Sequence, residues 1–312
     1  MPVEVPPALA ASLEEWLGAD GRAWAARLPL LAGELLDRWE LRPDGPVAHG
    51  VVALVLPVRC ADGTPAALKL QRVDEETAGE PLALRAWDGR GAVRLLDHEP
   101  ASGSMLLERL DPRRSLLAVP DDLAALRVIA DLLVELTKRQ APPGVRTLAD
   151  VSADLLERSP GAVAAHGDPD ERSLLAGCTA ALREAATDPG DRLLHWDLHY
   201  GNVLAPLPGS GRGPWLAIDP KPLAGHPGFE LLPALRNRWA DLVATGNLGR
   251  ALRRRFDVLT EALELDREVA TAWTLARVLQ NAVWAAEDGG TAEGGTELDP
   301  AERAVAELLS DR

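Results

Sequence analysis

The stretch HWDLHYGN occupies residues 195–202, and Ile218-Asp219 follows it at the end of the next apolar segment. Within this stretch Asp197 and Asn202 lie five positions apart on one predicted tight loop. At this spacing a carboxylate can lie beside an acceptor hydroxyl while an amide oxygen reaches a metal ion, an arrangement that phosphoryl transfer uses. Asp219 would supply a second carboxylate to a magnesium ion. The pattern therefore predicts Asp197 as the catalytic aspartate and Asn202 and Asp219 as metal ligands.

A lysine upstream supports this interpretation. The support matters because a His-x-Asp-x-x-x-x-Asn pattern arises by chance in about one such chain in a hundred. Lys69 is one of only three lysines and lies among apolar residues on a predicted strand. A charge in that position is costly unless it is paired, which suits a lysine held between nucleotide phosphates and a helix carboxylate. We expect Glu80 as that carboxylate, with Glu76 as the second choice. The turn at residues 49–50 is a candidate for a loop over the phosphates, although the chain has no Gly-x-Gly-x-x-Gly motif.

The first third of the chain has the pattern of an antiparallel sheet with helices. Apolar residues at helical spacing come first, and Val- and Leu-rich segments separated by turn residues follow. Helices are predicted at residues 8–17, 24–39 and 76–87, with Pro81 in the first turn of the last one. Strands are predicted at residues 51–60, 66–73, 93–97 and 104–108.

The remainder of the chain is predicted to be mainly helical. Helices are expected at residues 121–140, 148–157 and 172–187 and again from residue 220 through residue 309, with breaks at residues 142–144 and 159–161 and short strands within residues 193–205 and 215–219. The glycine-rich residues 289–295 read as a flexible tip. The change of pattern near residues 110–114 predicts an N-terminal lobe of residues 1–110 and a helical lobe of residues 111–312. The fold class is α+β.

Composition limits the classes of function. A chain of 312 residues suits one large domain or two packed lobes. The longest apolar run, residues 51–58, is far shorter than the roughly 20 residues that span a bilayer, and the N-terminus lacks the build of a secretory signal. We therefore expect a cytoplasmic protein without a membrane partner. Two cysteines are too few for a disulfide framework, and a net charge of -15 argues against a nucleic-acid partner and favours cationic or neutral small molecules.

Over nearly its whole length the chain resembles the aminoglycoside phosphotransferase family, and within it most resembles streptomycin 6-phosphotransferases and hydroxyurea phosphotransferases. The resemblance is carried by RWEL at residues 38–41, ALKL at 67–70, RLLDH at 94–98, LLERL at 106–110, and residues 195–204, 215–220 and 275–288. It implies a bilobal protein-kinase-like fold, with a small antiparallel-sheet N-lobe and a larger helical C-lobe. It also implies ATP and Mg²⁺ as cofactors, with adenine bound at the hinge by backbone groups of Glu108 to Leu110.

The resemblance implies an ATP-dependent transfer to a hydroxyl of an aminoglycoside, with streptomycin at position 6 as the first candidate and hydroxyurea or another small molecule as the alternative. Acidic residues near the C-terminus of such proteins commonly meet cationic substrates. The corresponding candidates here are Asn281, Trp284, Glu287 and Asp288, of which three share a helix face at three- and four-residue spacing. A structural helix face explains them equally well. Two residues depart from the commoner family pattern: Trp196 stands where a small residue is usual, and Glu230 where aspartate is frequent.

Two other classes of function stay open at this point. His195, Asp197 and His199 could hold a transition metal, but such an enzyme gives no role to Lys69 or Asn202. A noncatalytic nucleotide-binding protein of the same fold is the other alternative, although every expected catalytic residue is present. The sequence does not distinguish a monomer from a dimer.

Overall fold

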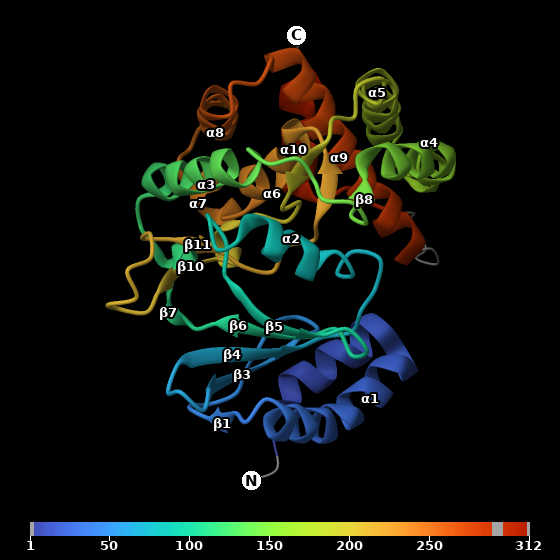
Figure 1. The fold of residues 1–312 in the computed structure, drawn as a ribbon. Helices are drawn as coiled ribbons and strands as arrows, with labels where there is room; N and C mark the ends of the chain where they lie inside the picture. The colour runs from blue at the N-terminus through green and yellow to red at the C-terminus, as the bar shows by residue number, and fades with distance from the viewer. Residues whose placement is uncertain (1–2, 289–295, 311–312) are drawn as a thin grey trace.

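The computed structural model describes residues 3–288 and 296–310. Its first part is a twisted antiparallel sheet with a helix on each face, and its second part is a larger group of helices together with two small sheets (Figure 1). The glycine-rich segment predicted as a flexible tip, residues 289–295, lies outside the described residues. Among the residues described, no helix combines the length and apolarity needed to cross a membrane.

The N-terminal sheet has the order β1-β3-β4-β6-β5, with β2 paired to β3, and every pairing in it is antiparallel. Its strands are β1 (Arg42–Pro43), β2 (Ala48–His49), β3 (Leu54–Arg59), β4 (Pro65–Leu70), β5 (Leu95–Glu99) and β6 (Ser104–Glu108). Leu54 lies opposite Leu70 across the β3–β4 hairpin, and Lys69 lies opposite Met105 on β6. The lysine thus occupies a central strand, bordered by strands on both sides.

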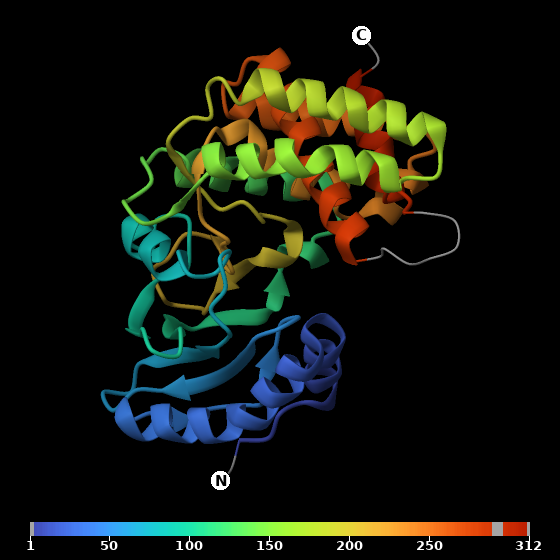
Figure 2. The same cartoon turned by 90° about the vertical axis from the view of Figure 1, so that its right-hand side faces the viewer.

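Helix α1 (Pro7–Arg38) covers the outer face of this sheet, as both views show (Figures 1 and 2). Two helices were predicted here, and the structure has one element with a break at Gly18, whose φ of 57° and ψ of -130° are non-helical. Glycine tolerates that backbone conformation because it has no Cβ. The buried leucines of α1 and the outward side chains of the sheet form a separate core.

Helix α2 (Glu80–Trp87) covers the opposite face and joins the sheet to the main core. It begins four residues later than the sequence pattern predicted. The Asp74 side chain accepts hydrogen bonds from the backbone N–H groups of Glu76 and Thr77, so residues 75–79 form turns instead of helix. Pro81 lies in the first turn, as expected.

The C-terminal part surrounds the long helix α9, which packs against α4, α5 and a 3₁₀ turn before α6. Its helices are α3 (Asp122–Leu136), α4 (Leu148–Ala165), α5 (Pro169–Ala185), α6 (Leu231–Arg236), α7 (Trp239–Ala244), α8 (Leu248–Ala262), α9 (Arg267–Asp288) and α10 (Pro300–Ser310). The predicted break at residues 159–161 is wrong, because α4 continues through Pro160. Proline leaves the Leu156 carbonyl without its usual backbone donor, and the Ser159 hydroxyl donates to that carbonyl at 3.3 Å instead.

Two three-stranded sheets hold the segments that carry the chemistry. One has the order β11-β10-β7 and the other β8-β12-β9. Their strands are β7 (Leu110–Ser115), β8 (Arg146–Thr147), β9 (Arg192–Leu194), β10 (Val203–Pro206), β11 (Leu216–Ala217) and β12 (Leu223–Gly225). The chain passes from the N-terminal sheet into the first of these at Arg109, between β6 and β7. The lobe boundary at residue 110 remains a prediction.

Candidate active site

A lysine and two carboxylates from three separate elements meet between the N-terminal sheet and the helical part. Lys69, on β4, donates to the two carboxylate oxygens of Glu80 on α2, at 2.8 and 2.9 Å. Its Nζ also contacts Asp219, which follows β11. Gln71 donates to the same Glu80 carboxylate. The structure thus brings together three of the residues that the sequence singled out.

The charges in this cluster stabilise one another. Lys69 is 4% exposed. Burial alone disfavours its charged form, but the Asp219 and Glu80 carboxylates outweigh this effect and raise the pKa of Lys69 above its ordinary value. Burial raises the pKa of Glu80. Burial also acts to raise the pKa of Asp219, but the nearby Lys69 charge prevails and lowers it, which keeps this carboxylate ionised.

The predicted tight loop lies between β9 and β10 and ends in a 3₁₀ turn, Tyr200–Asn202. The Asn202 side-chain N–H donates to the Asp197 backbone carbonyl at 3.0 Å, and the His199 N–H donates to the same carbonyl at 3.1 Å. Two further bonds join the loop to the segment around Asp219: the N–H of Ile218 donates to the Asn202 carbonyl at 2.9 Å, and that of Lys221 to the His195 carbonyl at 3.0 Å. Asp197, Asn202 and Asp219 are therefore held on one framework.

His195 supports the loop from beneath. Its ring is fully buried and stacks on Trp87, with ring centroids 6.2 Å apart. Its Nε2–H donates to the Ile218 carbonyl at 2.9 Å, while Nδ1 accepts from the N–H of Asp197 at 3.4 Å. Burial lowers the pKa of His195 to about 4, so the ring is neutral near pH 7. These contacts make it a brace for the backbone on both sides of the site.

Glu230 holds the start of the loop from the other side. Its carboxylate is 0% exposed and accepts hydrogen bonds from the backbone N–H groups of His195, at 2.5 Å, and Trp196, at 2.9 Å. Burial raises the pKa of Glu230 to about 7, although both of these bonds act against the increase. Trp196 has a φ of 66°, which is unfavourable for a residue with a Cβ. The paired bonds to one carboxylate help to hold this backbone conformation.

The donor set suits a hard divalent cation. The Asn202 amide uses its N–H group within the loop, so its side-chain oxygen remains available, and Asp219 adds a carboxylate oxygen. A transition-metal centre is not formed: the described residues contain no group of three or more His, Cys, Asp or Glu side chains placed to hold a metal. The His195 ring nitrogens are both used, and the Nδ1 of His199 accepts from the N–H of Gly201 at 3.0 Å.

Of the two segments proposed to contact the nucleotide, the turn at residues 49–50 borders this cluster: a Cβ at Gly50 would lie 3.9 Å from the Asp219 carboxylate. At the junction of the two sheets, the Glu108 N–H donates to the Arg94 carbonyl at 2.9 Å, and its carboxylate pairs with Arg212 at 2.8 Å. Leu110 begins β7 and lies opposite Pro206.

The four residues predicted to contact the substrate lie in different surroundings. Asn281 donates to Glu302 on α10 at 2.5 Å, and the Trp284 ring packs edge-on against the Trp196 ring at 6.0 Å. Trp284 therefore lies beside the loop of residues 195–202. Asn281 is bound to α10, and the exposed carboxylate of Glu287 accepts from Arg158 on α4 at 2.8 Å. Asp288 ends α9, and its side chain lies outside the described part of the structure.

Sequence reasoning missed Arg277, which lies one turn before Asn281 on α9. It is 6% exposed, and its guanidinium lies 5.0 Å from the centre of the Trp196 ring and 5.4 Å from that of Trp284. The signal was present in the sequence, because Arg277 lies in the apolar run TLARVL at residues 274–279. A charge within an apolar run is the same feature that identified Lys69.

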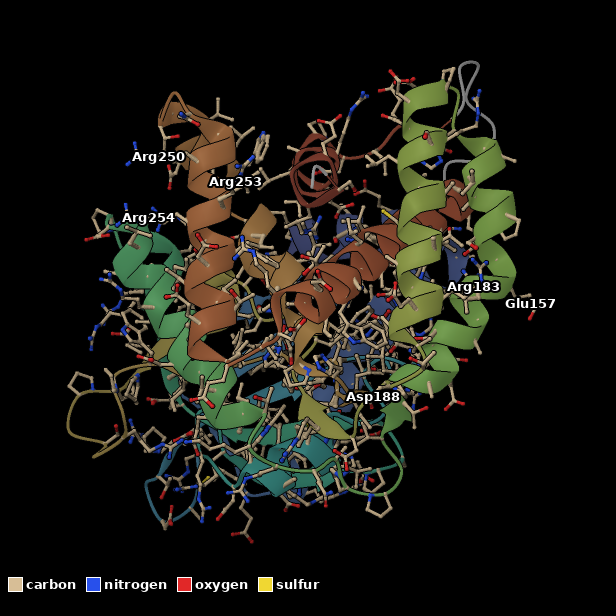
Figure 3. All side chains as sticks on the ribbon, turned by 90° about the horizontal axis from the view of Figure 1, so that it is seen from above. Glu157, Arg183, Asp188, Arg250, Arg253 and Arg254 are labelled. Atoms are coloured by element: carbon tan, nitrogen blue, oxygen red, sulfur yellow. The ribbon has the colours of Figure 1, made fainter. Side chains whose placement is uncertain are left out.

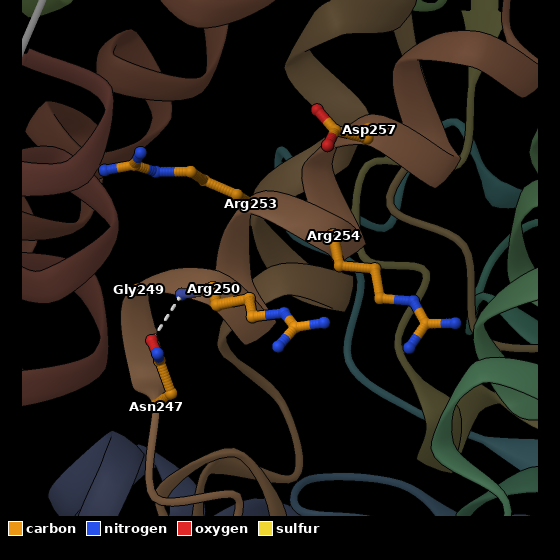
Figure 4. A pocket seen from close by; sticks show the side chains of 6 residues that line it. All are labelled: Asn247, Gly249, Arg250, Arg253, Arg254 and Asp257. Carbon is orange, nitrogen blue, oxygen red and sulfur yellow. Dashed lines mark hydrogen bonds between the residues drawn. The ribbon is translucent and has the colours of Figure 1, made fainter.

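A hollow of about 490 Å³ lies elsewhere, along the first turns of α8. In the view from above, Arg250, Arg253 and Arg254 occupy the side of the molecule opposite Arg183 and Glu157 (Figure 3). The close view shows Arg253 extending to one side and the other two arginines to the other, so the three guanidinium groups do not converge (Figure 4). None of the residues that line this hollow belongs to the loop of residues 195–202 or to the cluster of Lys69, Glu80 and Asp219.

Comparison with known proteins agrees with this geometry. A sequence model of the family described as aminoglycoside/hydroxyurea antibiotic resistance kinase matches residues 38–289. The chain is 54% identical to a streptomycin 6-kinase of Streptomyces glaucescens over 98% of its own length and 97% of the relative's. It is also 54% identical to a hydroxyurea phosphotransferase of Kitasatospora aureofaciens, over 99% and 87% of the two chains.

A solved aminoglycoside phosphotransferase from Streptomyces rimosus, in complex with ADP and streptomycin, is 17% identical and matches with a TM-score of 0.50 over 82% of this chain and 98% of that one. This likeness confirms the bilobal kinase-like fold that the sequence predicted. Because the family match spans most of the chain and full-length relatives are more than half identical to it, the chain belongs to the aminoglycoside/hydroxyurea antibiotic resistance kinase family and is a small-molecule phosphotransferase.

Proposed function

We propose that the protein transfers the γ-phosphate of ATP to a hydroxyl of an aminoglycoside, with streptomycin at position 6 as the acceptor, and so inactivates the antibiotic. The observation that carries this proposal is the convergence of Lys69, Glu80 and Asp219 beside the loop of Asp197 and Asn202. The 54% identity to a streptomycin 6-kinase supports the choice of acceptor. The reaction belongs in the cytoplasm, where ATP is available.

In this mechanism the chain's residues divide between nucleotide and acceptor. Lys69, held in place by Glu80, binds phosphate oxygens, and backbone groups of Glu108 to Leu110 bind adenine. Asp197 orients the acceptor hydroxyl and takes its proton. Asn202 and Asp219 would hold magnesium, which neutralises charge on the phosphates. Because His195 is neutral and both of its ring nitrogens are engaged, it supports the loop and takes no part in proton transfer.

A coupled assay of ADP release, run with streptomycin, other aminoglycosides and hydroxyurea, tests the proposal when product masses are also determined. We expect release to depend on streptomycin and the product to gain one phosphoryl group. An enzyme that phosphorylates none of the aminoglycosides contradicts the proposed acceptor.

The variant Asp197→Ala tests the chemistry separately. Removal of a positioned general base lowers turnover by roughly 10² to 10⁴-fold. We expect that loss with ATP affinity nearly unchanged, as measured by calorimetry. Asp188→Ala is the matched control, since Asp188 is an exposed carboxylate of the same lobe (Figure 3). Normal turnover by Asp197→Ala contradicts the assignment.

Hydroxyurea is the second candidate acceptor, because a hydroxyurea phosphotransferase shares 54% identity with this chain. Its hydroxyl is carried on nitrogen beside a carbonyl group, and Asp197 would address it in the same way. The ratio of kcat/KM for the two compounds decides between them.

A further inference from the structure

Arg277 is a buried cation that lies over the faces of three aromatic rings. Its guanidinium carbon lies 5.0 Å from the ring centre of Trp196, 5.4 Å from that of Trp284 and 5.7 Å from that of Phe229. An aromatic ring attracts a guanidinium cation but does not replace an oxygen acceptor for its N–H groups. The rings therefore hold Arg277 in place without satisfying its hydrogen-bonding edge.

That edge is only partly used by the protein. Nη1 bonds to the uncharged side-chain oxygen of Gln280, one turn along α9. The buried Nε has no hydrogen-bond partner among the described residues. A buried donor of a charged group is unfavourable when it stays unpaired, so an oxygen that reaches this edge is bound strongly.

The charges around the catalytic aspartate distinguish Arg277 from its neighbours. Lys221 pairs with Glu76 at 2.9 Å, and Arg236 pairs with Glu302 at 2.9 Å. Burial lowers the pKa of Arg277 to about 10, and among the neighbouring charges the Asp197 carboxylate opposes this shift most strongly. Arg277 thus remains charged at neutral pH. Its guanidinium lies 5.0 Å from the ring centre of Trp196, the residue that precedes Asp197 in the loop.

We propose that Arg277 recognises the acceptor by donating hydrogen bonds to an uncharged oxygen that lies next to the hydroxyl addressed by Asp197. This inference rests on the proposed function and specifies its substrate class. At this point the acceptor presents a hydroxyl or carbonyl oxygen to Arg277, and its cationic groups face away from that guanidinium. Both candidate acceptors meet this requirement, because the inositol-derived ring of streptomycin carries a hydroxyl on one carbon next to the 6-hydroxyl, and hydroxyurea carries a carbonyl beside its N–OH group.

The test compares Arg277→Met with the wild-type enzyme, using streptomycin and hydroxyurea as acceptors. Methionine keeps apolar contact with the rings but has no donor. We expect kcat/KM for the acceptor to fall by about ten- to a hundredfold, the effect of a lost hydrogen bond to a charged group. The KM for ATP and the slow hydrolysis of ATP without acceptor should stay unchanged, because neither involves the acceptor oxygen.

Arg267→Met is the matched control. Arg267 begins the same helix, lies 5.0 Å from the Phe256 ring centre and pairs with Asp257 at 2.5 Å, so it also stacks on an aromatic ring. We expect wild-type kinetics from it. Arg277→Lys keeps the positive charge and N–H donors but not the planar fork of the guanidinium, and should show a smaller loss of the same kind.

Two results overturn the inference. The first is an unchanged kcat/KM for the acceptor in both Arg277→Met and Arg277→Lys. The second is an equal fall in kcat/KM for acceptor and for ATP together with a lower unfolding temperature, which indicates a purely structural role. Failure of the proposed function is recognised separately in the wild-type enzyme. If it phosphorylates neither compound, the proposed function is wrong and the Arg277 inference falls with it. If it phosphorylates one, the variants decide on Arg277 alone.

Discussion

At the scale of single residues, His195 and Asp197 show how two positions in one loop acquire opposite properties. The His195 ring is fully buried and neutral near pH 7, whereas Asp197 is partly exposed beside the loop's hydrogen bonds. The Glu230 carboxylate holds the backbone at the start of this loop by accepting hydrogen bonds from the N–H groups of His195 and Trp196. Aspartate is more frequent at position 230 in the family, and the glutamate of this chain accepts both of these hydrogen bonds.

The buried histidine predicts a loss of stability in acid. Its folded pKa of about 4 lies below the ordinary value of about 6.5, so between these values the unfolded chain binds a proton that the folded protein does not. The free energy of unfolding should therefore fall by about 1.4 kcal/mol per pH unit below pH 6 from this residue alone. Urea unfolding at pH 7.5 and 5 measures it: the stability of His195→Gln should depend less on pH than that of the wild type. His49→Gln, at an exposed position, should follow the wild type, and parallel curves for all three proteins contradict the prediction.

At the scale of elements, α1 is held by the face it buries. Its buried leucines pack on the outward side of β3 and β4. Its apolar spacing was visible in the sequence, but the spacing does not show which face of which sheet the helix would cover. The break at Gly18 lets the two segments of the helix turn toward the sheet separately.

Two leucines of α1 that lie two positions apart provide a matched test of this packing. Leu28 is 0% exposed and Leu30 is 67% exposed. Leu28→Ala should destabilise the protein by about 2 to 5 kcal/mol because it leaves a cavity, whereas Leu30→Ala should change stability by less than about 0.5 kcal/mol. Equilibrium unfolding in urea measures both values. Equal effects of the two substitutions would mean that α1 does not pack on the sheet as described.

At the scale of the whole molecule, the net charge of -15 acts on any charged partner. Near the active site, Lys221 and Arg236 are paired with carboxylates and Arg277 lies over aromatic rings. The overall field therefore attracts cationic acceptors toward the protein, whereas recognition inside the site depends on hydrogen bonds. Attraction and recognition are thus separate effects.

This separation predicts a difference in salt dependence between the two candidate acceptors. Salt screens the attraction between exposed charges, with a Debye length of about 10 Å at 0.1 M. The KM for streptomycin, a cation, should rise between low and high salt, while that for uncharged hydroxyurea should stay constant. Steady-state kinetics in sodium chloride at fixed magnesium and ATP measure this. Equal salt effects on both compounds would show that the protein's field does not guide the acceptor.

Local patterns predicted much of the fold and part of the site. The strands of the first hairpin, the helices around residues 121–140 and 172–187 and the tight loop follow from spacing within short segments. The predictions of the break at residues 159–161 and of the start of α2 failed because a side chain forms a hydrogen bond with the backbone there. The Ser159 hydroxyl does this before Pro160, and the Asp74 carboxylate does it before α2. Such hydrogen bonds are not visible in the apolar spacing on which the predictions depended.

The sequence by itself predicted which residues could serve phosphoryl transfer, because Asp197 and Asn202 lie on one loop and a lysine in an apolar strand needs a partner. Only the tertiary structure decided which distant groups meet. In it Arg158 donates a hydrogen bond to Glu287, and Arg277 lies over the rings of Trp196 and Trp284. The physical reason is that these contacts join different elements, so their distances depend on how helices and sheets pack and not on spacing along the chain.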